Sequence, residues 1–157
     1  MHAEQRDRSD RVSPLASGAG VTIRILGPSD AAVLNDVAPD VFDNAIDPRW
    51  SAAFFADPRH HLAVALIDEQ VVGMASAVHY VHPDKPPELW INEVGVSSLH
   101  RRRGIGKRLM AALLAHGRTL GCTEAWLGTE SGNVAARRLY AAAGGEEEPM
   151  VYVTFRI

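Results

Sequence analysis

A basic, glycine-containing hexapeptide is the segment of this sequence best suited to chemistry. Arg101-Arg102-Arg103-Gly104-Ile105-Gly106 precedes a long helical pattern, and Lys107 follows it directly. The first N–H groups of a helix have no partner within the helix, and the peptide dipoles place about half a positive charge there. Glycines at positions 104 and 106 let an anion approach the backbone, and the cationic side chains add charge-assisted hydrogen bonds. The spacing predicts a diphosphate-binding loop that is neither a Walker loop nor a dinucleotide fingerprint.

Two further segments carry polar side chains in positions suited to a ligand. Glu93 is in phase with Leu89 and Ile91 on an otherwise apolar strand, where a carboxylate must be paired, solvated by a cleft or functional. Asn133 and Tyr140 are two helical turns apart, with Ala136 between them on the same face. Both side chains can therefore point to one ligand, although Asn133 is equally a good N-cap and Tyr140 equally a core residue.

Composition excludes several classes of protein. The 157 residues carry 16 basic and 19 acidic side chains, a net charge of −3, and can form one ordinary core. Five positive charges gather in residues 100–108 without an acid, but no aromatic residues interleave them, so we expect no nucleic-acid partner. One cysteine, Cys122, permits no intramolecular disulfide, and the seven histidines show no metal-binding spacing. No apolar run is long enough to span a membrane, so we expect a cytoplasmic protein without a metal or membrane partner.

Hydrophobic periodicity positions these residues on an α/β (α+β) fold. Residues 1–20 are polar and aperiodic and are expected to form a flexible leader, with one domain at 21–157. Ser29 is expected to cap a helix that Pro39 ends. We expect a mixed sheet of about six strands with helices on both faces. The other expected helices are 48–56, 104–120 and 133–143, and the expected strands are 21–26, 62–67, 71–80, 89–96, 125–128 and 150–157.

The order of these motifs resembles that of the GNAT superfamily of N-acetyltransferases. Arg101–Gly106 is similar to the family signature R/Q-x-x-G-x-G/A, and residues 133–144 are similar to its N-x-x-A-x-x-L-Y-x-x-x-G. Within the superfamily, residues 24–30, 71–73, 88–96 and 100–105 most resemble the small aminoglycoside N-acetyltransferases of the 3-N type I group. The family's aspartate on the fourth strand is Glu93 here. The resemblance implies a GNAT fold, acetyl-coenzyme A as cofactor, an aminoglycoside as acceptor and resistance to the antibiotic, and it is compatible with a homodimer.

The resemblance also implies roles for individual residues. A primary amine is almost wholly protonated at pH 7, so acetyl transfer needs a base, and Glu93 is our candidate. A structural ion pair is the alternative for Glu93. Tyr140 corresponds to a tyrosine that protonates the leaving thiolate. The backbones of Val94 and Val96 correspond to the strand edge that binds the pantetheine arm, and Gly95 leaves room for the acetyl group.

Acids elsewhere are candidates for binding a cationic amino sugar, because carboxylates suit spaced ammonium groups. These are Asp43, Asp47, Glu88 and Glu130, together with Glu93. Two other functions stay open. One is an acetyltransferase acting on a protein N-terminus, a lysine, a polyamine or another small amine. The other is a coenzyme A-binding sensor without turnover.

Overall fold

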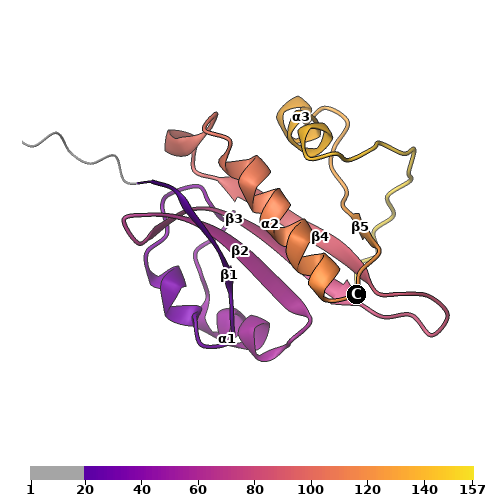
Figure 1. Cartoon of the computed structure of the whole chain (residues 1–157), viewed down its shortest axis with the longest axis horizontal. Coiled ribbons are helices and arrows are strands. Elements are labelled where there is room, and N and C mark those ends of the chain that lie inside the picture. Colours follow the sequence, from indigo (N-terminus) through magenta and orange to yellow (C-terminus); the bar gives the residue numbers. More distant parts are fainter. Residues whose placement is uncertain (1–19) are drawn as a thin grey trace, which may run out of the picture.

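The computed structural model describes residues 20–157, so the flexible leader expected at 1–20 lies outside the described residues except for Gly20. Ten elements follow in chain order (Figure 1). Eight of the ten helices and strands expected from the sequence lie within two residues of the observed bounds, and one of the eight, the helix at 48–56, has the expected bounds. The elements are β1 (Thr22–Leu26), η1 (Ala31–Asn35), α1 (Pro48–Ala56), β2 (His60–Ile67), β3 (Gln70–Tyr80), β4 (Glu88–Val96), η2 (Ser98–His100), α2 (Ile105–Thr119), β5 (Glu124–Trp126) and α3 (Val134–Ala142).

The sheet is mixed, as expected, and contains five strands in the order β1-β2-β3-β4-β5. Strands β1 to β4 are antiparallel neighbours, whereas β5 joins β4 in parallel after the crossover through α2. The expected sixth strand is wrong: residues 150–157 lie outside the sheet, and six of their large hydrophobic side chains are 62% exposed or more. Alternation suits such a segment to a sheet, but a strand exists only where a neighbour pairs with its backbone.

The helix expected between Ser29 and Pro39 is also wrong, because only a short 3₁₀ turn, η1, forms there. Asp30, at its N-cap, accepts a hydrogen bond from Gly27 N at 2.8 Å instead of capping the helix. Farther on, Val71 N donates to Asp36 O and Ala38 N donates to Val71 O, at 2.9 and 2.8 Å. Pairing with β3 therefore extends the chain at the point where a helix would have continued.

The core lies between the sheet and α2, which runs along it (Figure 1). Ile105, Leu109 and Leu113 form the expected apolar stripe and are at most 1% exposed. Each such side chain stabilises the fold by about 1.5–3 kcal/mol. A Cβ at Gly117 would lie 2.9 Å from a methyl group of Leu89, so glycine permits the close approach of α2 to β4. No helix within residues 20–157 is long and apolar enough to cross a membrane.

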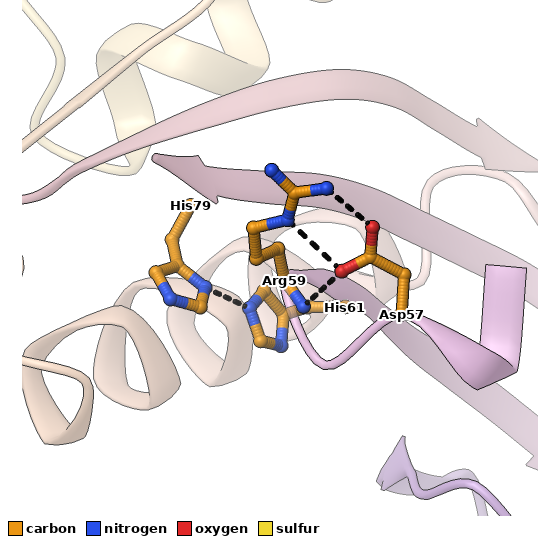
Figure 2. A network of polar contacts seen from close by, with 4 residues as sticks. All are labelled: Asp57, Arg59, His61 and His79. Atoms are coloured by element: carbon orange, nitrogen blue, oxygen red, sulfur yellow. Dashed lines mark hydrogen bonds and ion pairs between the residues drawn. The ribbon is translucent and has the colours of Figure 1, made fainter. Parts of the chain in front are cut away.

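Three histidines, one each from β2, β3 and α2, form a hydrogen-bonded chain between the sheet and the helix. His61 Nε2 lies 2.8 Å from His79 Nδ1, and His61 Nδ1 lies 3.0 Å from His116 Nε2; Figure 2 shows the first of these contacts. His61 is only 6% exposed. Burial, with the neighbouring histidines, lowers the pKa of His61 from 6.5 to about 4. In the folded protein His61 is therefore neutral at pH values at which the same side chain binds a proton in the unfolded chain.

This histidine makes the stability of the protein depend on pH. Between pH 6.5 and about 4 the unfolded chain binds more protons than the folded one, so the free energy of unfolding falls as the pH falls through this window. We expect a maximal slope of about 1.4 kcal/mol per pH unit from this group. Denaturant titrations at pH 4 to 8 measure the slope. It should be reduced in His61→Leu and kept in His60→Leu at the adjacent exposed position; equal slopes in the wild type and His61→Leu would contradict the prediction.

Candidate functional site

The turn that leads into α2 has the backbone geometry of an anion site. Gly104 is the N-cap of α2 with φ of 71°, and Arg102 has φ of 60°. A left-handed conformation at a non-glycine residue is strained, and such residues gather at functional sites. The first turn of α2 contains no acid, and Gly104 offers no side-chain cap. The first N–H groups of the helix are therefore free of a side-chain cap and can bind an anion.

The cationic side chains of this turn are exposed and unpaired by acids. Among residues 20–157, Arg101, Arg102, Arg103 and Lys107 form no ion pair with a carboxylate. Arg101 Nε donates to Val96 O at 3.3 Å. Arg108 differs, because its guanidinium donates to Val21 O at 2.9 Å and so binds the start of β1. Four of the five positive charges thus surround the anion site.

The two glycines of the loop have different surroundings. A Cβ at Gly104 would meet no atom within 4 Å, which leaves the backbone open to a ligand. A Cβ at Gly106 would lie 3.0 Å from a methyl group of Leu139. Gly106 therefore has a packing role in addition to the one expected from the sequence: it brings α3 against the first turn of α2.

Strand β4 has a free edge beside the anion site. Its ladder with β5 covers only Glu88–Trp90 opposite Glu124–Trp126. Beyond these pairs, Val94 and Val96 still pair with β3, and no strand within residues 20–157 pairs with their other side. The edge can receive an extended ligand by backbone hydrogen bonding, as a further strand would.

A β-bulge determines the side of the sheet on which Glu93 lies. Ala77 pairs with Ile91, but the next residue along β3, Ser76, pairs with Glu93, so Asn92 is the extra residue. Adjacent residues of β3 face opposite sides, and paired residues share a side. Glu93 therefore lies opposite to Ile91 and Leu89, and the expectation that the three are in phase is wrong. The side of the sheet cannot be predicted here from the alternation of residues along the sequence, because the extra residue Asn92 shifts that alternation by one position.

Glu93 lies on the side of the sheet covered by the segment between η1 and α1. Gly95 is on the same side, where the backbone carbonyl of Val41 occupies the place of a Cβ. Burial, and secondarily the charge of Asp43, raise the pKa of the half-buried Glu93 carboxyl above its ordinary value. A carboxylate with a raised pKa is a stronger base than a solvated one.

A pocket of about 780 Å³ opens beside these carboxylates. It is lined by side chains between positions 31 and 52, among them Asp40, Asp43 and Ser51. Asp43 therefore connects the pocket to Glu93. Asp40 was not among the residues expected at the site; its carboxylate accepts a hydrogen bond from Ser98 N at 3.1 Å, which joins the pocket wall to η2.

Two of the other acids expected to bind an acceptor have partners of their own, and the third is exposed. Asp47 is the N-cap of α1 and forms an ion pair with Arg49 at 2.8 Å. Glu88 pairs with Lys85 and accepts a hydrogen bond from Tyr80. Glu130 is exposed in the loop before α3. The structure thus brings Asp43 and Glu93 together.

Helix α3 presents the second expected polar group. Asn133 Oδ1 accepts a hydrogen bond from Ala136 N at 3.1 Å, so Asn133 is the N-cap of α3. Tyr140 is half-buried, and burial raises the pKa of its phenol. The hydroxyl consequently stays protonated near neutral pH and can act as a proton donor.

Comparisons with known proteins agree on one family. The sequence profile of the acetyltransferase (GNAT) family matches residues 31–144. An aminoglycoside N(6')-acetyltransferase type 1 of Salmonella typhimurium is 32% identical over 97 residues, which are 58% of this chain and 67% of that protein. Among solved structures, an aminoglycoside acetyltransferase from an uncultured soil metagenomic sample superposes with a TM-score of 0.75 at 19% identity, covering 87% and 96% of the two chains. AAC(6')-Iy in complex with CoA superposes with a TM-score of 0.71 at 23% identity, covering 91% and 99%.

The contact of Gly95 with Val41 predicts that this glycine holds the pocket segment against β4. Gly95→Ala would place a methyl group on the Val41 carbonyl, so we expect a loss of about 1–3 kcal/mol in unfolding free energy. Gly132→Ala is the matched control, because a Cβ there meets no atom within 4 Å. Denaturant unfolding measures both variants. A Gly95→Ala protein as stable as Gly132→Ala would show that the contact is not needed.

Proposed function

The chain belongs to the acetyltransferase (GNAT) family, and we propose that it acetylates an amino group of an aminoglycoside antibiotic. As a family member it is an acetyl-coenzyme A-dependent N-acetyltransferase. The proposal concerns the acceptor, and its main support is the pair of carboxylates, Asp43 and Glu93, beside an open pocket. The names of the Salmonella relative and of the metagenomic structure point to the same class of acceptor.

The cofactor fits the basic turn of this chain. Uncapped N–H groups at the start of α2 and the side chains of Arg101, Arg102, Arg103 and Lys107 suit a diphosphate, and the free edge of β4 at Val94–Val96 suits an amide-bearing arm. Bound acetyl-coenzyme A supplies a thioester as acetyl donor. In the proposal, Gly104, Ile105, Gly106 and Ala136 line the same binding surface.

In the proposed reaction, Glu93 acts as the base and Tyr140 as the acid of direct acetyl transfer. Glu93 removes a proton from the bound ammonium group and leaves a neutral nitrogen, which attacks the thioester carbonyl in the ternary complex. Asp43 holds the cationic acceptor near that carboxylate. Tyr140 would donate the phenolic proton to the departing thiolate, because burial keeps the phenol protonated. The resulting phenolate would recover a proton from the attacking nitrogen, which loses its second proton as it becomes an amide.

A coenzyme-release assay with an acceptor panel tests the proposal. We expect turnover with kanamycin-like or gentamicin-like aminoglycosides and less with peptides or polyamines, with the acetylated nitrogen located by NMR. Glu93→Gln should lower kcat by about 10²–10⁴ while coenzyme A binding stays unchanged, because a base acts on the rate. Glu69→Gln, in the β2–β3 turn, is the matched control. Turnover with peptides alone would refute the aminoglycoside acceptor, and coenzyme A binding without any turnover would indicate a sensor.

The pH dependence of the reaction tests the placement of Asp43. The acid limb of the kcat/KM profile should lie above the ordinary pKa of a glutamate, because Glu93 must be ionised and its pKa is raised. In Asp43→Asn a like charge is removed, the pKa of Glu93 falls, and the limb moves to lower pH. Asp68→Asn, in the β2–β3 turn, should leave the limb in place. An unmoved limb in Asp43→Asn would mean that Asp43 and Glu93 do not interact.

A further inference from the structure

Two tryptophans lie on the same side of the sheet as Glu93. Glu88 and Trp90 alternate with the buried Leu89 and Ile91, and the bulge at Asn92 returns Glu93 to the side of Trp90. Trp126 pairs with Trp90 across the short β4–β5 ladder. The indoles are stacked, with ring centroids 5.5 Å apart and an interplanar angle of 11°. The tryptophans lie three strand positions from Glu93, which is about 10 Å along β4.

A hydrogen-bonded chain fixes this pair of indoles. Trp126 Nε1 donates to the hydroxyl of Tyr80 at 2.6 Å, and that hydroxyl donates to Glu88 Oε2, also at 2.6 Å. Lys85 completes the chain by an ion pair with Glu88. The polar groups of the cluster therefore satisfy one another, and the negative charge of Glu88 is balanced by an adjacent cation.

Trp90 remains 39% exposed although one of its faces lies on Trp126. A rigid aromatic surface next to a base is the kind of surface that binds a ligand, because aromatic side chains give large contact areas at little entropic cost. Because Lys85 balances the negative charge of Glu88, the exposed surface of Trp90 offers apolar area without a net negative charge beside it. Its preferred ligand is thus a ring with an apolar face.

We propose that Trp90, supported by Trp126, is a sugar-binding platform for the acceptor. A pyranose ring lies against the exposed indole surface, with its C–H groups toward the negative face of the aromatic ring. A neighbouring amino-bearing ring then reaches Glu93 and Asp43. The inference rests on the proposed function, since it assigns the ring next to the acetylated amine. Tyr80, Glu88 and Lys85 are positioning residues that hold the platform.

A steady-state comparison of three variants tests the platform. Trp90→Ala should raise the KM for kanamycin about tenfold with little change in kcat or in the KM for acetyl-coenzyme A, whereas Trp90→Phe should recover most of the affinity. Trp50→Ala is the matched control, because Trp50 is 71% exposed on α1. Circular dichroism verifies that each variant is folded. A KM for kanamycin within twofold of the wild type in Trp90→Ala would overturn the inference.

A second measurement separates the platform from the proposed function. Saturation-transfer NMR with maltose, an uncharged disaccharide, should show contact with the wild type and none with Trp90→Ala. If the wild type acetylates no aminoglycoside, the proposed function fails and this experiment alone decides the platform. The absence of a maltose signal in the wild type would then overturn it.

Discussion

The extra residue in β4, Asn92, is the constraint on which the rest of the site depends. With regular alternation, Glu93 would face α2, in a core where an unpaired carboxylate costs several kcal/mol. The bulge turns it instead to the side that carries Asp43 and the pocket. A bulge also bends a strand and increases its twist. This agrees with a β4–β5 ladder that ends at Trp90, two residues before the bulge.

The short ladder between β4 and β5 leaves β4 with a closed end, where both of its edges are paired, and an open end, where it pairs with β3 alone. At Trp90 and Trp126 the strands are held by backbone pairing and by the stacked indoles. Beyond them no strand of the described part of the chain pairs with this edge of β4 as far as Val96, where the chain turns toward the basic loop. A parallel pair of only three residues is weak by itself. Side-chain contacts at the closed end therefore stabilise the arrangement that leaves the other end open.

Sequence patterns predicted the elements whose side chains follow one regular period. The apolar stripe of α2 is an example, because one face of this helix is buried. The patterns failed where tertiary pairing decided the outcome. Pairing of Asp36 and Ala38 with Val71 limits η1 to one short turn, and residues 150–157 have the alternation of a strand without a neighbour. The bulge at Asn92 contains no glycine or proline that would have indicated it in the sequence. Regular alternation along the strand therefore predicted the wrong side of the sheet for Glu93.

The site carries positive charges on one side and negative charges on the other. The basic turn before α2 carries the positive charges, and Asp43 and Glu93 carry the negative ones. The basic turn before α2 is exposed and carries no acid, so its charges remain available to a polyanion. Across β4, burial and secondarily the charge of Asp43 raise the pKa of Glu93. In the proposed function, a cationic acceptor offsets that repulsion and favours the charged form of Glu93. In the proposed function, the like charge of Asp43 therefore both raises the basicity of Glu93 and attracts the ammonium group on which Glu93 acts.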